Sequence, residues 1–324
     1  MKYIGLQQQI DSNNRKSILL LLSFPILVLV LVFAFISIIN FNPPAEYNNY
    51  TSTPYDWDNV ISQFIEAVPY VFVAVGVWFV IAYWSNTAMI NASAHSETLS
   101  RKENMRVYNL TENLCMSVGM TMPKLRIIES GALNAFASGI NEKNYTVTLT
   151  RGIIDKLNDD ELEGVIAHEL THIRNRDVRL LIVSIIFVGI FSFLINIAFR
   201  LLWSTGGSRR RGKDDKGGGA IFLVVLVLAI LGYFFSIFFK LSLSRKREYL
   251  ADSGAVEMTK KPLALASALE KISGRDEVPE VSNKDVKQMF ISNGSFQSKF
   301  LGGLRSLFST HPPIEKRIEL LKQF

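Results

Sequence analysis

The stretch His168-Glu169-Leu170-Thr171-His172 places two histidines four residues apart, with a glutamate directly after the first of them. Residues four apart lie on one face of a helix, which has about 3.6 residues per turn, so both imidazoles can reach one metal ion. Glu169 then lies where it can take a proton from a reacting water without binding the metal itself. The alternative is that both histidines only pack or form hydrogen bonds. Because two of the chain's 4 histidines fall in this pattern, we favour the metal site.

The residues around this motif predict that it lies within a partly buried helix. Asn158 can cap a helix, and acidic residues follow it in the first turn, where the helix dipole favours negative charge. Apolar residues then recur at helical spacing: Val165, Ile166, Leu170 and Ile173. We therefore predict a helix over about Asp160–Asn175, with its apolar side turned toward a core.

A catalytic zinc usually has three protein ligands and one open position. A third histidine shortly downstream is excluded, because positions 173–177 read Ile-Arg-Asn-Arg-Asp. The strongest candidate is Glu248, on a later predicted helix. Asp252 lies one turn beyond it on the same face, where a second carboxylate can accept the free N–H of a ligating imidazole. Taken alone, Glu248 would be interpreted as a solvated residue among basic neighbours; its pairing with the histidine motif favours ligation.

Three stretches together resemble one family. Residues 168–172 (His-Glu-Leu-Thr-His), 247–252 (Arg-Glu-Tyr-Leu-Ala-Asp) and 309–313 (Ser-Thr-His-Pro-Pro) are similar to the motifs of the HtpX-type membrane zinc metalloproteases. The wider family includes the CAAX prenyl endoproteases. The resemblance covers nearly the whole chain, including the order of its apolar segments.

The resemblance implies roles for individual residues. It implies one Zn²⁺ per chain with three ligands: His168, His172 and Glu248. Glu169 is then the general base, and His311 stabilises the oxyanion. Arg317, six residues after His311, is expected to pair with Asp252 or another carboxylate of the site. The alternative for His311 is a histidine at a helix entry, held by the two prolines that follow it.

Residues 133–139 read Leu-Asn-Ala-Phe-Ala-Ser-Gly and resemble the family's Asn-Ala-Phe-Ala element, which borders the substrate cleft. Strand-prone runs lie on either side, at 124–129 and 145–150. An exposed strand edge beside the metal helix can bind an extended peptide through backbone hydrogen bonds. The sequence leaves open which strand forms that edge, and an ordinary core hairpin is the alternative. The implied substrate-binding residues are Asn134, Ala135 and Phe136.

The chain has 324 residues, 48% hydrophobic and 20% charged, and its apolar residues are concentrated in four runs without charge. A bilayer-crossing helix needs about 20 residues, and each run is long enough. A cleaved signal peptide is the alternative for the first run, but such a peptide has a shorter apolar core, of about 7–15 residues. We predict a mainly α membrane protein with four spans: 17–40, 68–85, 180–199 and 220–239.

The remaining segments predict a zincin-like α+β catalytic domain with a small β-sheet. We expect residues 1–90 to form one transmembrane hairpin and residues 178–243 a second. The zinc protease domain is then built from residues 91–177 and 244–324. Soluble helices are expected at 96–116, 262–273 and 314–322.

The net charge of +6 would suit nucleic-acid binding, but the basic residues cluster beside apolar runs, which is typical of membrane orientation. We predict no nucleic-acid partner and a multi-pass protein of a bacterial-type cytoplasmic (inner) membrane, with its active site facing the cytoplasm. Residues 204–219 disagree, because they hold 5 Lys and Arg yet four crossings place them outside. His172 and Glu248 can meet only if the chain between them returns to the side it left, which either two crossings or a hairpin that dips in without crossing would achieve. The single Cys115 excludes an intrachain disulfide and a Cys-rich zinc site.

The expected function is a zinc-dependent endopeptidase that hydrolyses misfolded or damaged membrane proteins in quality control. The expected partners are unfolded polypeptide substrates and the lipid bilayer. One alternative is a CAAX-type prenyl-protein processing protease, although those relatives have more spans, which enclose a chamber. A second alternative is a non-catalytic membrane adaptor. Every expected catalytic position is filled, which argues against the adaptor.

Overall fold

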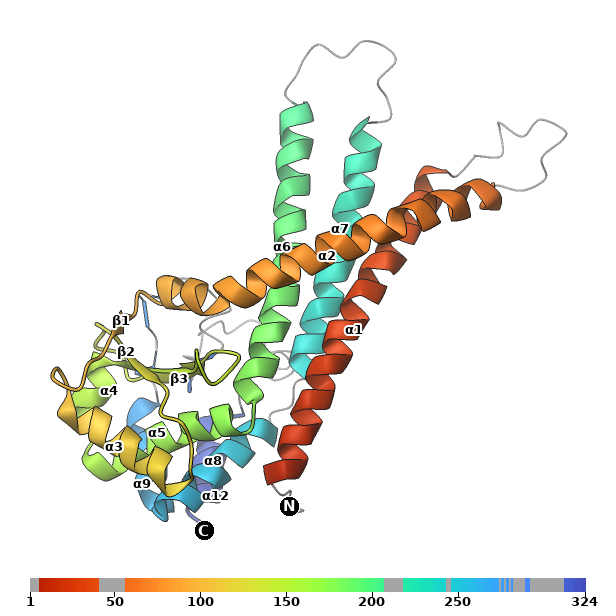
Figure 1. Cartoon of the computed structure of the whole chain (residues 1–324). Helices are drawn as coiled ribbons and strands as arrows, with labels where there is room; N and C mark the ends of the chain where they lie inside the picture. The colour runs from red at the N-terminus through yellow and green to blue at the C-terminus, as the bar shows by residue number, and fades with distance from the viewer. Residues whose placement is uncertain are drawn as a thin grey trace, which may run out of the picture. The chain divides into compact units, whose positions relative to one another are not determined.

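A computed structural model of the chain describes residues 6–40, 56–206, 218–242, 246–273, 275–276, 278–279, 281, 289–291 and 312–324. The described part is mostly helical and contains one small mixed sheet (Figure 1). Two compact units emerge from the contacts within it. The first comprises Met1–Ser17, Trp84–Ile182 and Leu241–Phe324, and the second comprises Ile18–Tyr83 and Val183–Lys240.

Helix α5 (Asp159–Arg174) carries the histidine motif, and its bounds agree with the predicted helix to within one residue. A capping box starts the helix: the backbone N–H of Glu161 donates to Asn158 Oδ1 at 2.9 Å, and Glu161 Oε2 accepts from the backbone N–H of Asn158 at 3.0 Å. Three further helices and the strand β3 pack around α5. These helices are α3 (Met105–Ser117), α8 (Lys246–Thr259) and α9 (Pro262–Ile272).

The sheet has the strand order β1-β2-β4-β3. Strands β2 and β4 run parallel, whereas β1 and β3 are antiparallel to their neighbours. The strands predicted at 124–129 and 145–150 are confirmed as β2 and β4. Residues 133–139, which resemble the family's Asn-Ala-Phe-Ala element, contain β3, and β3 is an edge strand of the sheet. The strands are β1 (Glu97–Thr98), β2 (Lys124–Ile128), β3 (Ala135–Ser138) and β4 (Thr146–Thr150).

The helix predicted over 96–116 is wrong in its first part. Glu97–Thr98 instead pairs with β2, and the helix α3 begins only at Met105. The physical reason is a helix cap, because Asn104 accepts a hydrogen bond from the backbone N–H of Val107 at 2.9 Å and so fixes the start. The short helix α4 (Arg151–Lys156) directly follows β4. The other two soluble helices are confirmed as α9 and α12 (Ile314–Leu321).

Within the described part of the chain, three helices are long and apolar enough to cross a membrane: Ile10–Ile39, Trp57–Ser85 and Asp177–Ile197. They lie in α1 (Leu6–Ile39), α2 (Trp57–Ser93) and α6 (Asp177–Gly206). The fourth predicted span lies within α7 (Gly218–Ser242), whose described apolar part, Leu223–Phe235, is shorter than a span. The fourth crossing therefore stays a prediction.

Helix α2 begins eleven residues before the predicted span at 68–85. Asp56 caps it, because its carboxylate accepts from the backbone N–H of Asn59 at 3.2 Å. Within the second unit, α7 approaches α6 closely at Gly232, where an added Cβ would lie 2.3 Å from the ring of Phe191. The same ring meets Phe24 of α1 edge-on, with 5.7 Å between the ring centroids.

Candidate metal centre

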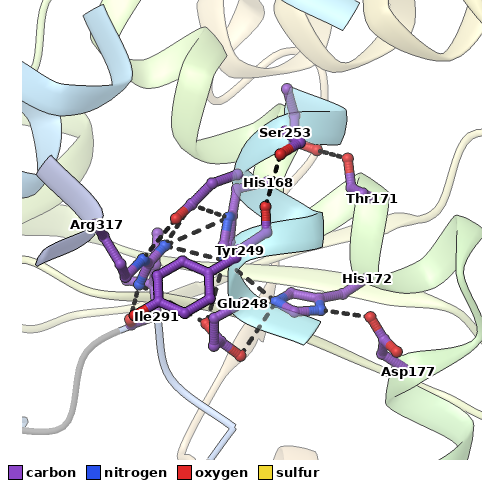
Figure 2. Close-up of polar contacts among 11 residues, drawn as sticks. His168, Thr171, His172, Asp177, Glu248, Tyr249, Ser253, Ile291 and Arg317 are labelled. Atoms are coloured by element: carbon purple, nitrogen blue, oxygen red, sulfur yellow. Dashed lines mark hydrogen bonds and ion pairs between the residues drawn. The ribbon is translucent and has the colours of Figure 1, made fainter. Parts of the chain in front are cut away.

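Two helices of the first unit bring three potential metal ligands together. His168 and His172 project from α5, and Glu248 projects from α8 toward both rings (Figure 2). The two Nε2 atoms lie 3.2 Å apart, and each lies 3.7 Å from one carboxylate oxygen of Glu248. The structure therefore places the three residues that the sequence singled out at one point, with one ligand atom of each within 4.8 Å of the others.

The opposite ring nitrogens face carboxylates. His168 Nδ1 lies 3.0 Å from Asp252 Oδ1, and His172 Nδ1 lies 3.0 Å from Asp177 Oδ2. In the neutral form of each ring, the hydrogen therefore resides on Nδ1, where it donates to a carboxylate. Both Nε2 lone pairs then point into the space that Glu248 borders.

This donor set fits a divalent cation. Two lone pairs and a carboxylate repel one another unless a positive charge lies between them. A tetrahedral zinc, with ligands at about 2.0–2.1 Å, holds them about 3.3 Å apart, close to the separations between these three side chains. Two imidazoles and one carboxylate also match the sites that keep one position open for catalysis.

The electrostatics of His168 point the same way. Burial lowers the pKa of this imidazole, but its hydrogen bonds to Asp252 and Glu248 outweigh that effect and raise the pKa to about 9. The carboxylates of Asp252 and Glu248 thus favour a positive charge at this ring, and a bound cation would supply one.

Asp252 and Arg317 form a buried ion pair behind the first histidine. Arg317 Nε donates to Asp252 Oδ2 at 2.9 Å and Nη2 to Oδ1 at 2.7 Å, a two-bond fork. Burial raises the pKa of Asp252, but the Arg317 charge and the His168 hydrogen bond lower it to about 2. Arg317 Nη1 also donates to the backbone oxygen of Ile291 at 3.1 Å. Helix α12 is thereby tied to the metal centre.

Glu169 lies on α5 between the two histidines and is 2% exposed. Burial raises the pKa of its carboxyl above the usual range, while His168, His172 and a hydrogen bond from the Ala137 backbone oppose the shift. Ala137 belongs to β3. Glu169 is therefore a buried carboxyl that contacts the edge strand of the sheet.

The three residues expected to bind substrate are buried around the start of β3. The side-chain amide of Asn134 donates to the backbone oxygen of Asp276 at 2.6 Å, and its oxygen accepts from the Ala135 N–H at 3.0 Å. The backbone oxygen of Ala135 accepts from Ile291 at 2.8 Å, and the Phe136 ring meets Phe290 edge-on. These side chains shape the edge strand from inside the protein.

His311, expected to stabilise the oxyanion, lies outside the described residues. Sequence reasoning missed Asp177, the carboxylate that faces the second histidine. The only signal was an acidic residue five positions after His172. Helical periodicity gives that spacing no meaning, because α5 ends at Arg174 and Arg176 adopts a left-handed φ of 60° before α6 begins.

A paired histidine–glutamate centre on buried helices, in a chain with membrane-spanning helices, defines the class of membrane metallopeptidases. Comparison with known proteins agrees. The model of Peptidase family M48 matches residues 101–324, and the chain belongs to that family. The resemblance to HtpX-type proteases is thereby confirmed.

Several relatives match nearly the whole chain. A "Protease HtpX homolog" from Bacteroides fragilis is 53% identical over 326 residues, which cover 100% of both chains. Another from Listeria monocytogenes is 37% identical and covers 97% of this chain and 98% of its own. A solved structure, "Crystal Structure of S. mikatae Ste24p", aligns with a TM-score of 0.45 and 17% identity, over 82% of this chain and 67% of that one.

Proposed function

We propose that this protein is a zinc-dependent endopeptidase that cleaves misfolded or damaged membrane proteins. The observation that carries the proposal is the convergence of His168, His172 and Glu248, with the buried Glu169 beside them. The quality-control role is supported by the family and by the HtpX-type relatives that match the full chain.

In this proposal, His168, His172 and Glu248 hold one Zn²⁺ in a zincin-like domain. When bound, zinc polarises the scissile carbonyl and makes water acidic enough to lose a proton near neutral pH. Asp252 accepts the Nδ1 hydrogen of His168 and so keeps its Nε2 lone pair directed at the metal. Arg317 neutralises Asp252 and holds it in place.

Glu169 is the proposed proton carrier. Its raised pKa gives it a greater affinity for a proton than an exposed glutamate has, so it can accept one from water as the water oxygen attacks the carbonyl carbon. As the C–N bond breaks, the same carboxyl returns the proton to the leaving amine. By resemblance to the family, His311 donates to the developing oxyanion.

The substrate is proposed to lie extended beside β3. This strand is at the edge of the sheet and contacts Glu169 through Ala137, so a peptide beside it would lie next to the base. It would have to fit around the hydrogen bond that the Ala135 backbone oxygen accepts from Ile291. Asn134, Ala135 and Phe136 are proposed to position this edge. Their internal hydrogen bonds and packing support that role.

The membrane arrangement is proposed to follow the sequence prediction. Four helices cross an inner membrane as two hairpins, within residues 1–90 and 178–243, and residues 91–177 and 244–324 form the cytoplasmic protease domain. Both ligand-bearing helices belong to one compact unit, while most of α6 and α7 belong to the other. The chain therefore leaves the catalytic unit after α5 and returns before α8, as a pair of crossings requires.

The proposal is tested with the full-length protein purified in detergent. We expect about one zinc per chain and cleavage of casein and of unmodified membrane proteins. Glu169→Gln should keep the zinc and lower the rate of cleavage by about 10²–10⁴-fold, the factor that general acid–base catalysis typically contributes. Wild-type protein without zinc, or a Glu169→Gln variant with full activity, would refute the mechanism. Exclusive cleavage of farnesylated peptides would point to prenyl-protein processing instead.

A further inference from the structure

A buried polar chain links the second metal-binding histidine to the first helix of the protein. His172 Nδ1 lies 3.0 Å from Asp177 Oδ2, and Asp177 Oδ1 accepts a hydrogen bond from Asn13 Nδ2 at 2.7 Å. Asp177 is the first residue of α6, and Asn13 belongs to α1. Asn13 is fully buried and Asp177 is 2% exposed, so these partners replace the water that both groups have lost.

The backbone around Asp177 is built to hold this side chain. Arg176 adopts a φ of 60°, a left-handed conformation that non-glycine residues rarely take, and it turns the chain sharply between α5 and α6. Asn13 Nδ2 also donates to the backbone oxygen of Asn175 at 2.8 Å, and Arg247 Nη1 donates to that of Asp177 at 3.4 Å. Two elements distant in sequence, α1 and α8, thus clamp the turn on which Asp177 lies.

The two carboxylates behind the histidines differ in charge balance. Asp252, behind His168, is neutralised by the Arg317 fork. Among the described residues, the Asp177 carboxylate receives hydrogen bonds from the neutral amide of Asn13 and from His172, and pairs with no Lys or Arg. The Asp177 carboxylate thus faces His172 Nδ1 directly, which keeps the hydrogen on that nitrogen and leaves Nε2 as the atom that can bind a metal.

We propose that Asp177 and Asn13 are positioning residues of the metal centre: Asn13 holds Asp177, and Asp177 orients the His172 imidazole. The proposal rests on the metal site of the proposed function. It makes the start of α1 a part of the metal centre, so metal affinity depends on the hydrogen bond from Asn13 to Asp177.

The neighbouring residue Asn14 provides a matched control. Asn14 Oδ1 accepts from Arg176 Nη1 at 3.2 Å, so it docks the same helix on the same turn. It makes no hydrogen bond to Asp177 in the described part of the chain. If α1 mattered only as a packed neighbour, Asn13→Ala and Asn14→Ala would have similar effects.

The experiment measures the zinc dissociation constant of the full-length protein in detergent by competition with a chelator. Asp177→Ala should weaken zinc binding by about 10–100-fold, the usual effect of losing the partner of a ligating histidine. Asp177→Asn should also weaken it, because Asn13 and His172 face different carboxylate oxygens and one of these becomes an NH2 group that cannot accept. Asn13→Ala should weaken it in the same direction, and Asn14→Ala should leave it within about 2-fold of wild type, since it keeps the Asp177–His172 bond.

A second readout separates positioning from general destabilisation. Bound Co²⁺ reports ligand geometry through its visible absorption bands, which should shift in Asp177→Asn and Asn13→Ala but not in Asn14→Ala. Wild-type zinc affinity and an unchanged Co²⁺ spectrum in both Asp177 variants would overturn the inference while leaving the zinc site intact. Failure of the wild-type chain to bind zinc would instead overturn the proposed function itself.

Discussion

Two carboxylates four residues apart on α8 have different tasks because their neighbours differ. Glu248 faces the two Nε2 atoms of the histidines, each 3.7 Å from one of its oxygens. Asp252 faces His168 Nδ1 and the guanidinium of Arg317. Arg317 Nη1 also lies 3.7 Å from Glu248 Oε2, but its two-bond fork is with Asp252. One turn of helix therefore separates a carboxylate that borders the space for a cation from a carboxylate that the Arg317 fork holds.

Replacing Glu248 tests this division. Glu248→Ala should remove stoichiometric zinc and casein cleavage, with a loss of zinc affinity greater than the roughly 100-fold that an outer partner contributes. Glu257→Ala is the control, because this glutamate lies exposed on the same helix. Zinc content by elemental analysis decides the question. Retained zinc in Glu248→Ala would place the third ligand elsewhere.

Replacing Arg317 should destabilise the protein. The side chain is 1% exposed, and its removal would leave Asp252 buried with only His168, among the residues that the structure describes, to offset its charge. Losing one partner of such a buried pair costs about 3–5 kcal/mol. Arg317→Ala should therefore melt well below wild type in a thermal denaturation of the detergent-solubilised protein. Lys316→Ala, an exposed neighbour on α12, should melt as wild type does; equal melting of both variants would contradict the importance of the pair.

At the scale of elements, the close approach of α5 and α8 sets the spacing of the ligands. Gly254 of α8 faces Thr171 of α5, and an added Cβ would lie 2.4 Å from the Thr171 methyl carbon. A side chain with even one carbon atom at position 254 would therefore clash with Thr171 unless the helices moved apart. Because Glu248 lies on α8 and both histidines lie on α5, the distance between the two helices determines how far the Glu248 carboxylate lies from the imidazoles.

Gly254→Ala should consequently weaken both stability and metal binding. Overpacking of this kind costs typically about 1–3 kcal/mol. Adding Thr171→Ser removes the clashing methyl group and keeps the hydrogen bond from the hydroxyl to Ala167, so the double variant should recover most of the loss. Melting temperature and zinc affinity are measured on the three proteins. A double variant no better than Gly254→Ala would show that the contact does not set the ligand spacing.

The N-terminus of α5 should make stability depend on pH. Burial raises the pKa of Glu161, but Lys271, Ser267 and the Asn158 backbone together lower it below its ordinary value. A lowered folded-state pKa stabilises the protein at any pH above the unfolded value, and the contribution disappears as pH falls through the folded value.

The difference in melting temperature between wild type and Glu161→Gln should therefore be greatest near neutral pH. It should shrink as pH falls below about 4.3, the ordinary glutamate pKa, because the wild-type carboxylate becomes protonated. Glu270→Gln, which removes an exposed pair with Lys322, should change the melting temperature little at any pH. A difference that is independent of pH would contradict the ionic contribution of Glu161.

Sequence alone located those parts of the fold and site that depend on local patterns. The motif helix was predictable because Asn158 caps it and apolar residues recur along it. Glu248 was predictable because the helical pattern places Asp252 one turn away from it. Asp177 could not be predicted, because its position depends on the positive φ of Arg176. The start of α3 was missed because a helical pattern does not reveal where a capping residue interrupts it.

At the scale of the whole molecule, helix length and charge distribution make opposite predictions for α6 and α7. Helix α6 has 30 residues and α7 has 25, so they extend about 45 Å and 37 Å at 1.5 Å per residue, longer than a hydrocarbon core of about 30 Å. The 5 Lys and Arg between residues 204 and 219 favour the cytoplasmic side. We expect length to prevail, because both helices are longer than the hydrocarbon core that they would cross.

The decisive test labels single cysteines in intact cells with a membrane-impermeant maleimide. In a Cys115→Ala background, Asp58→Cys and Ser208→Cys should react from outside, whereas Lys102→Cys should react only after lysis. Asp58 is exposed in the first turn of α2, and Lys102 is exposed in the segment that follows α2. They serve as reference positions for the outer and the cytoplasmic side of the membrane. If Ser208→Cys reacts only after lysis, α6 and α7 dip into the membrane without crossing it, and the basic residues between them stay in the cytoplasm.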